Sequence, residues 1–272
     1  MTTLQKQSLS EANNLARLYA RQEKRIKLKL KKALEKGNDP TYLKRLQRSI
    51  GKDISDLNGI YDNYSYDRMP DIYVEQALAT DAAIIKAVGS QGMPVAPNKQ
   101  AIKILADNTF NGLSDVTQVM GRRSAGFLRD IGLRQARGIV FGSDTWQEVA
   151  RNMTKELEQS KFFYVKYKTK TGIRQVPAKV YSKMVARTTA AEANRQGTIN
   201  RIQAWGYDLV VVQGISRFEG SPCIPYQGRT LSISGKSDKY TPLEQAKENG
   251  LFHPNCIHNL AFSEMNKTMM VS

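Results

Sequence analysis

Residues 40–61 read PTYLKRLQRSIGKDISDLNGIY, and the apolar residues in this stretch recur at steps of three and four. This spacing places a narrow apolar stripe along one side of a helix, as in a coiled-coil seam. Asp39 can cap the N-terminus of the helix, and Pro40 suits its first position because the amide hydrogen it lacks would be unpaired there. The stripe predicts a helix that packs on a partner through Leu43, Leu46, Ile50, Ile54, Leu57 and Tyr61.

A second apolar stripe precedes this helix and supplies that partner. Ser8 and Glu11 have the spacing of a capping box, so Ser8 is the expected N-cap. Gly37 and Asn38 are expected to end the helix. Two helices joined by a short turn predict an antiparallel helical hairpin over residues 1–66. The stripe of the first helix consists of Leu15, Leu18, Ile26, Leu30 and Ala33.

The hairpin carries much of the positive charge of the chain. The whole sequence has 41 Lys+Arg against 25 Asp+Glu, a net charge of +16 and a pI of about 9.8. Residues 1–50 alone hold 13 Lys/Arg and four acidic residues. A surplus of this size indicates an anionic partner, and flexible surface cations can contact phosphates without reading base sequence. We expect non-specific contact with nucleic acid or with an acidic protein, and a merely solvated helix face is the alternative. The candidate nucleic-acid-binding residues are Arg21, Lys24, Arg25, Lys27, Lys29, Lys31, Lys32, Lys36, Lys44, Arg45 and Arg48.

Composition excludes several classes of protein. A chain of 272 residues that is 40% hydrophobic and 24% charged is typical of a globular protein with one large domain or two to three small ones. We find no apolar run of the ~18 residues that a membrane helix needs, and we expect no membrane partner. The N-terminal residues lack the apolar core of a signal peptide. Two cysteines cannot form a disulfide framework in a chain of this length, so we expect synthesis in a reducing cytoplasm.

The remaining sequence predicts a helical middle region and a C-terminal module that mixes helices and strands. Alternating residues from 162 to 168 and from 173 to 176 predict a strand pair with a turn at Thr171-Gly172. Short strands are expected at 209–212 and 231–233, and Thr241 with Glu244 is expected to cap a short helix. We expect helices over 70–89, 98–111, 114–140, from Ser143 or Asp144 to about 158, and over 178–204. The predicted fold class is mostly α with a C-terminal α+β module, and the predicted domains are residues 1–66, 67–160 and 161–272.

All Cys and His residues of the chain lie in one C-terminal stretch: Cys223, His253, Cys256 and His258. These are the residue types that zinc prefers, and four such ligands complete a structural tetrahedron with no open position for water. A packed, hydrogen-bonded cluster without metal is the alternative. A nucleophilic Cys–His pair could be drawn from Cys256 and His258 or from Cys223 and His253. The first pair is disfavoured because the two residues alternate along an extended loop, and no Ser-His-Asp order stands out among only two histidines. We assign no catalytic residues and expect no enzymatic activity.

The same region resembles the head-morphogenesis or minor capsid proteins of tailed phages, the Mu F-like group and its relatives. The resemblance covers roughly residues 145–262. Two departures are Tyr226, where many members have a second cysteine, and Ile257, where the family usually has arginine. The matching positions are Arg187, Thr188, Cys223, Gln227, Gly228, His253, Pro254, Cys256 and His258.

This resemblance implies a structural protein of the virion. Such proteins enter the procapsid in few copies, associate with the portal and are thought to help DNA packaging or delivery. It implies a location in the capsid interior after assembly in the host cytoplasm, with portal protein, viral DNA and the scaffold or major capsid protein as partners. The alternatives are an enzyme or toxin-related effector of the ADP-ribosyltransferase type, and a cytosolic nucleic-acid-binding protein.

Overall fold

A computed structural model describes residues 3–36, 39–89, 96–141, 146–158, 162–169, 172–216, 219–253, 256 and 258–266. It is mostly helical with two small antiparallel sheets toward the C-terminus, which confirms the predicted fold class. Packing divides the chain into two compact units, each built from separate stretches of sequence. Unit 1 comprises residues 1–12, 64–109 and 186–272, and unit 2 comprises residues 13–63 and 110–185. The division into three consecutive domains stays a prediction.

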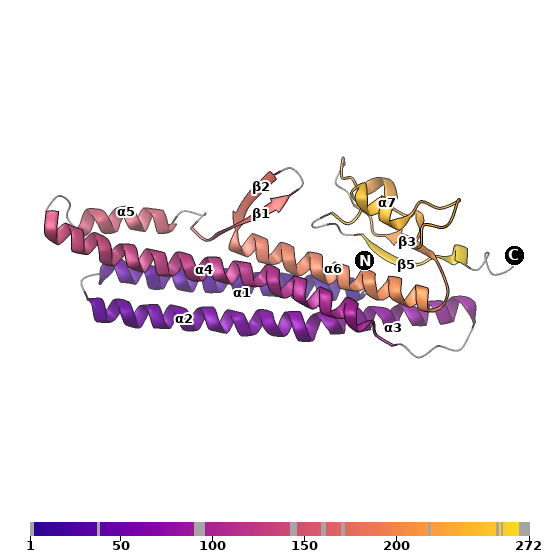
Figure 1. Cartoon of the computed structure of the whole chain (residues 1–272), viewed down its shortest axis with the longest axis horizontal. Coiled ribbons are helices and arrows are strands. Elements are labelled where there is room, and N and C mark those ends of the chain that lie inside the picture. The colour runs from indigo at the N-terminus through magenta and orange to yellow at the C-terminus, as the bar shows by residue number, and fades with distance from the viewer. Residues whose placement is uncertain are drawn as a thin grey trace. The chain divides into compact units, whose positions relative to one another are not determined.

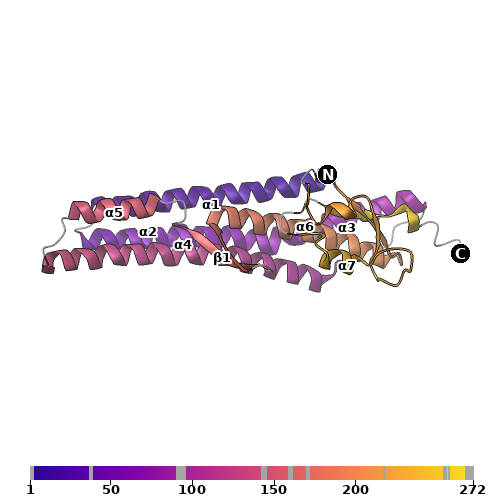
Figure 2. The ribbon, with the colours of Figure 1, turned by 90° about the horizontal axis from the view of Figure 1, so that it is seen from above.

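Unit 2 is built around three long helices: α1 (Thr3–Glu35) from residue 13 onward, α2 (Pro40–Asn63) and the later part of α4 (Lys99–Phe141). Figures 1 and 2 show these helices running side by side. Asp39 caps α2 as predicted, because its Oδ1 accepts hydrogen bonds from the amides of Thr41 at 2.8 Å and Tyr42 at 3.0 Å. The predicted turn residues Gly37 and Asn38 lie outside the described residues.

The predicted seam of α2 is buried inside unit 2, and part of it meets α4, because the ring of Tyr61 lies 5.1 Å from that of Phe110. Leu46, Ile50, Leu57 and Tyr61 are buried on α2, and Ile26 and Leu30 are fully buried on α1. One charged group is enclosed among them. The carboxylate of Asp53 is 1% exposed and accepts a hydrogen bond of 2.6 Å from Lys29 Nζ, while Arg25 Nε lies 3.2 Å from its other oxygen. This ion pair joins α1 and α2.

Three helix boundaries differ from the prediction. Helix α1 already begins at Thr3, and Ser8 lies inside it, where its hydroxyl donates to the carbonyl of Leu4 instead of capping. The expected helices over 98–111 and 114–140 are one continuous helix, α4, because a glycine at position 112 keeps its backbone hydrogen bonds and costs only about 1 kcal/mol in a helix. The expected boundary near Met69-Pro70 is no break either. Helix α2 continues through a π-helical turn, η1 (Tyr64–Arg68), into α3 (Met69–Val88).

A short helix and a β-hairpin complete unit 2 together with the start of α6. Helix α5 (Trp146–Glu158) ends where predicted, whereas its expected caps Ser143 and Asp144 lie outside the described residues. Strands β1 (Tyr164–Thr169) and β2 (Gly172–Pro177) pair antiparallel, as predicted, although Thr171 also lies outside the described residues. The side chain of Tyr164 packs against α4, where the guanidinium of Arg123 lies 4.6 Å from the ring centre.

Unit 1 places a three-stranded sheet against helix α6 (Ala178–Ala204). The central strand is β3 (Leu209–Gln213), between β4 (Thr230–Ser232) and β5 (Asn259–Phe262), and both pairings are antiparallel. Ile199 and Ile202 of α6 share a buried core with the sheet and with the short helix α7 (Leu243–Glu248). The predicted capping box of α7 is wrong, because Pro242 occupies the N-cap position without a side-chain cap. Strand β5 is an element that the sequence analysis did not predict.

Helix α3 approaches α6 closely in unit 1, and Gly197 makes that approach possible. A Cβ atom at position 197 would lie 2.6 Å from the backbone oxygen of Tyr73. Around this point Gln76 donates to Thr198 at 3.1 Å, and Asn200 donates to the Tyr73 hydroxyl at 2.8 Å. These hydrogen bonds between α3 and α6 depend on the short separation that Gly197 allows.

In the part of the chain that the structure describes, no helix is long and apolar enough to cross a membrane.

We expect Gly197→Ala to destabilise the protein by about 1–3 kcal/mol, because the added methyl group would push backbone away from backbone. Gly59→Ala is the matched control, since Gly59 lies in α2 with no atom within 4 Å of the position of an added Cβ. The control should be neutral or stabilise by up to about 1 kcal/mol through helix propensity. Chemical denaturation followed by circular dichroism measures both. Equal stabilities of the two variants would contradict the close approach.

Candidate metal centre and cationic surface

The Cys and His residues come together at one end of the central strand β3. The loop after β3 returns to it, because Gly228 donates its amide to the carbonyl of Val212 at 3.0 Å. At the same end, Asn259 at the start of β5 is paired with Gln213. The segment with Cys223 and the segment with His258 are thus anchored to the two sides of one strand end, which explains their proximity despite their distance in sequence.

A second close approach brings His253 to Cys223. Gly250 follows α7 with a φ of 101°, and a Cβ atom at this position would lie 2.6 Å from Cβ of Pro222. Only glycine fits here, because both the backbone angle and the neighbouring proline exclude a side chain. The backbone at Gly250 therefore passes directly beside Pro222, the residue before Cys223.

Three of the four predicted ligands form a compact cluster. The ligand atoms of Cys223, His253 and Cys256 all lie within 4.8 Å of one another. Cys223 Sγ is 3.3 Å from His253 Nε2, and the hydroxyl of Ser221 contacts both, at 3.1 Å from the sulfur and 3.0 Å from the nitrogen. Cys223 is buried, with 1% of its surface exposed, whereas His253 and Cys256 are half-buried.

His258 lies next to this cluster but outside the group of three. Its Nδ1 is 3.2 Å from Cys256 Sγ. The imidazole is fully buried, and its Nε2 has no hydrogen-bond partner among the described residues. This nitrogen points in a different direction from Nδ1, so a metal ion held beside Cys256 through Nδ1 would leave Nε2 without a partner. The predicted bend at Pro254, and Ile257, lie outside the described residues.

The ionisation of these groups in the absence of metal follows from their burial. Burial raises the pKa of the Cys256 thiol, and the neighbouring thiol of Cys223 adds to the effect. Burial also lowers the pKa of His258, with a further contribution from His253. At neutral pH the metal-free site therefore holds a thiol and a neutral imidazole. A metal ion would have to displace the thiol proton, so binding would release protons.

Helix α6 holds the segment that carries these residues. The guanidinium of Arg195 donates to the carbonyl oxygen of His258 at 3.4 Å and lies 4.2 Å from the centre of the Phe252 ring. Phe252 itself has a φ of 64°, which is rare for a residue with a side chain. Arg195 is buried and pairs with Glu192 at 2.7 Å. Burial acts to raise the pKa of Glu192, but the charge of Arg195 and hydrogen bonds from Gln196 and Arg195 outweigh it and lower that pKa.

The arrangement suits metal binding better than catalysis. Two thiol sulfurs and an imidazole nitrogen within 4.8 Å can hold a divalent metal ion such as zinc. A nucleophilic cysteine needs access to substrate, and Cys223 has almost no exposed surface. Two members of this environment, Ser221 and Arg195, were not predicted from the sequence. The hydroxyl two residues before Cys223 was a visible signal, whereas the position of Arg195 over Phe252 depends on the fold.

The predicted nucleic-acid-binding residues divide into cations that hold the fold and cations that face solvent. Lys27 and Lys29 are half-buried, and they pair with Glu23 at 3.3 Å and Asp53 at 2.6 Å. Arg25 pairs with Asp53, and Lys31 lies 3.4 Å from Glu158. Lys36 is exposed, 5.5 Å from the ring centre of Tyr42. Within the described residues, six further cations are exposed without an ion pair: Arg21, Lys24, Lys32, Lys44, Arg45 and Arg48.

Comparison with known proteins gives one match. Residues 6–265 match the family model described as phage minor capsid protein 2. No curated protein and no solved structure matches the chain. The matched residues take in all four Cys and His positions and nearly all of both compact units.

We expect Arg195→Ala to destabilise the protein by about 2–3 kcal/mol. The substitution leaves Glu192 and the carbonyl of His258 without their partner, and the cost is below that of a fully buried pair because the side chain of Glu192 is 35% exposed. Lys183→Ala on the same helix is the control, and this exposed residue should change stability by no more than about 0.5 kcal/mol. Thermal denaturation measures both variants. A stability for Arg195→Ala equal to that of the control would contradict the role of Arg195 as the support of the His258 segment.

Proposed function

The chain belongs to the phage minor capsid protein 2 family, and from that premise we propose that it contacts packaged DNA through its solvent-facing cations and associates with the portal. The family makes the chain a structural protein of the virion, a minor component of the phage head. The single observation that carries the proposal is this match over residues 6–265, which extends beyond the C-terminal region and includes the basic hairpin.

The exposed cations of α1 and α2 support contact with DNA. They lie on helices held by an apolar seam, so their side chains are free to reach phosphates while the backbone stays ordered. Contacts of this kind depend on charge and not on base sequence. A head protein has to accommodate any stretch of the genome, and such a surface meets that need.

The portal is the proposed protein partner, with the scaffold or major capsid protein as further contacts. This part of the proposal rests on the family alone. It places the chain in the capsid interior after assembly in the host cytoplasm, as an assembly component with no catalytic role. The burial of Cys223 agrees with a structural task for the Cys and His cluster.

The cluster itself is proposed to hold a structural zinc ion through Cys223, His253, Cys256 and His258. Bond lengths of about 2.3 Å to sulfur and about 2.0–2.1 Å to nitrogen put tetrahedral ligand atoms roughly 3.3–3.8 Å apart. The separations of 3.3 Å between Cys223 and His253 and 3.2 Å between Cys256 and His258 are close to that range. Such an ion would join the two segments at the end of β3.

We expect the full-length protein to bind duplex DNA of unrelated sequences with equal affinity. If about five to eight phosphates are contacted, the affinity should fall roughly 10²–10⁴-fold between 50 and 200 mM salt. Fluorescence anisotropy with two duplexes of different sequence measures this. The intact chain is needed, because residues 1–50 supply buried core residues such as Ile26, Leu30 and Ile50 and their deletion would disrupt unit 2. A salt-independent affinity, or no binding at 50 mM salt, would contradict the proposed DNA contact.

We expect the purified protein to contain about one zinc ion per chain. Cys223→Ser and Cys256→Ser should each remove most of it, and chelation should lower the melting temperature because metal binding is coupled to folding. Elemental analysis and differential scanning fluorimetry measure these effects. Ser221→Ala is the control, because it removes the contacts to Cys223 and His253 without removing a ligand.

The control variant should keep its zinc. A zinc-free protein after expression in zinc-supplemented medium, with a melting temperature unchanged by added zinc, would show that the cluster is a hydrogen-bonded core. His258→Asn addresses the fourth position, and we expect it to weaken zinc retention. Full retention in that variant would remove His258 from the ligand set.

A further inference from the structure

A groove between α2 and α4 in unit 2 is lined by cations on both sides. Its volume is about 630 Å³, and its charged lining residues are Lys44 on α2 and Arg122 and Arg129 on α4. No acidic side chain is among the lining residues that the structure describes. Arg122 and Arg129 are two helical turns apart, so their Cα atoms are separated by about 10 Å along the helix. The groove thus presents a row of positive charge beside the hairpin.

A second groove continues this surface toward the β-hairpin. It is lined by Arg122 and Arg123 of α4 and by Tyr164 and Lys166 of β1, with Asp115 as its one acidic residue among those described. Lys166 and Lys168 lie on the same face of β1 as Tyr164, because side chains alternate along a strand. Arg122 lines both grooves, so the two form one continuous surface.

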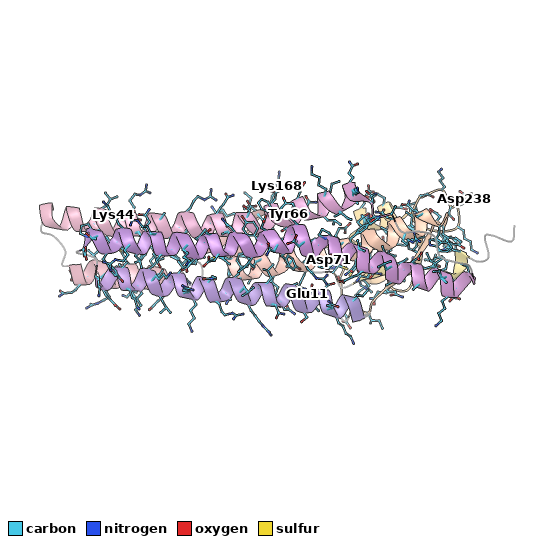
Figure 3. The ribbon with its side chains drawn as sticks, turned by 90° about the horizontal axis from the view of Figure 1, so that it is seen from below. Glu11, Lys44, Tyr66, Asp71, Lys168 and Asp238 are labelled. Atoms are coloured by element: carbon cyan, nitrogen blue, oxygen red, sulfur yellow. The ribbon has the colours of Figure 1, made fainter. Side chains whose placement is uncertain are left out.

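We call this surface the α2–α4–β1 face. Its six cations are exposed, and no ion pair engages them within the described part of the chain. Lys44 and Lys168, near its two ends, are labelled in Figure 3. Its members are Lys44, Arg122, Arg123, Arg129, Lys166 and Lys168.

On the premise of the proposed DNA contact, we propose that the α2–α4–β1 face is where the phosphate backbone binds. Guanidinium groups match the geometry of phosphate oxygens, and three of the six cations are arginines. The larger aliphatic lining residues, Leu43, Val119 and Leu128, are half-buried or buried, and none of the exposed large apolar residues lines either groove. Protein interfaces use such residues as anchors and are depleted in lysine, so the face fits DNA better than an acidic protein. Only Lys44 of this face belongs to the cations predicted from sequence.

Two triple variants with the same loss of charge test the assignment. The face variant carries Lys44→Gln, Arg122→Gln and Arg129→Gln. The control variant carries Arg151→Gln, Lys155→Gln and Lys183→Gln, which are exposed residues of α5 and α6 in the same unit and outside the predicted DNA-binding set. Anisotropy titrations of a duplex at several salt concentrations give the affinity and the slope of log K against log salt. A Lys166→Gln/Lys168→Gln variant repeats the test on a separate element.

The face variant should bind at least about 10-fold more weakly at 100 mM salt, with a slope reduced by roughly two to three, since each lost phosphate contact lowers it by about 0.9. The control should lose less than one unit of slope, and the β1 variant about one to two. Equal losses of affinity in the face and control variants would overturn the proposal. They would indicate that DNA is attracted by positive charge spread over the whole surface. Displacement of DNA by polyglutamate at equal charge concentration would also overturn it, in favour of an acidic protein. Absence of binding by the wild-type protein would instead contradict the proposed function itself.

Discussion

The ion pair between Lys29 and the buried carboxylate of Asp53 is the constraint on which the basic hairpin depends. Lys29 and Arg25 are one turn apart on α1, and both reach Asp53 on α2. A carboxylate that is 1% exposed is costly unless it is paired, so the helices are held in the register that brings these groups together. The same contact draws Lys29 away from solvent, whereas Arg25 stays 60% exposed although it is paired. The other cations of the two helices lie outside the apolar seam, and most of them are exposed to solvent.

In unit 1 the corresponding constraint is the anchoring of two segments at one end of β3. Glycine at position 250 allows one approach, and Arg195 on α6 supports the other segment through the carbonyl of His258. Protein contacts on both sides of β3 accompany a cluster in which the ligand atoms of Cys223, His253 and Cys256 lie within 4.8 Å of one another. A zinc ion bound there would link the two segments, and its binding free energy would add to the stability of the fold.

Local patterns allowed much of the fold to be predicted, and non-local contacts account for what was missed. The seam of α2 and the Asp39 cap depend on neighbours along one helix, and the structure confirms both. Strand β5 has only four residues, and its identity depends on pairing with β3, which sequence spacing does not reveal. The expected break between residues 111 and 114 does not occur, because tertiary packing carries α4 through Gly112.

The same distinction between local patterns and non-local contacts applies to the residues of the candidate sites. The Cys and His residues were found by their clustering, whereas the support by Arg195 requires knowing that α6 passes over Phe252. Among the cations, sequence counted charge without knowing which side of each helix is covered. Lys29 was therefore included although Asp53 holds it, and Arg122 and Arg129 were omitted although they line a groove. A charge surplus predicts the kind of partner, and the packing decides which side chains can reach it.

Ultraviolet crosslinking of purified virions, followed by mass spectrometry of DNA-linked peptides, tests the central claim most directly. The account predicts that the chain is present in DNA-filled heads and that its crosslinked peptides come from α2, α4 and β1. Empty procapsids should yield the chain without these crosslinks. Absence of the chain from virions, or its presence in filled heads with no crosslink to DNA, would contradict the account.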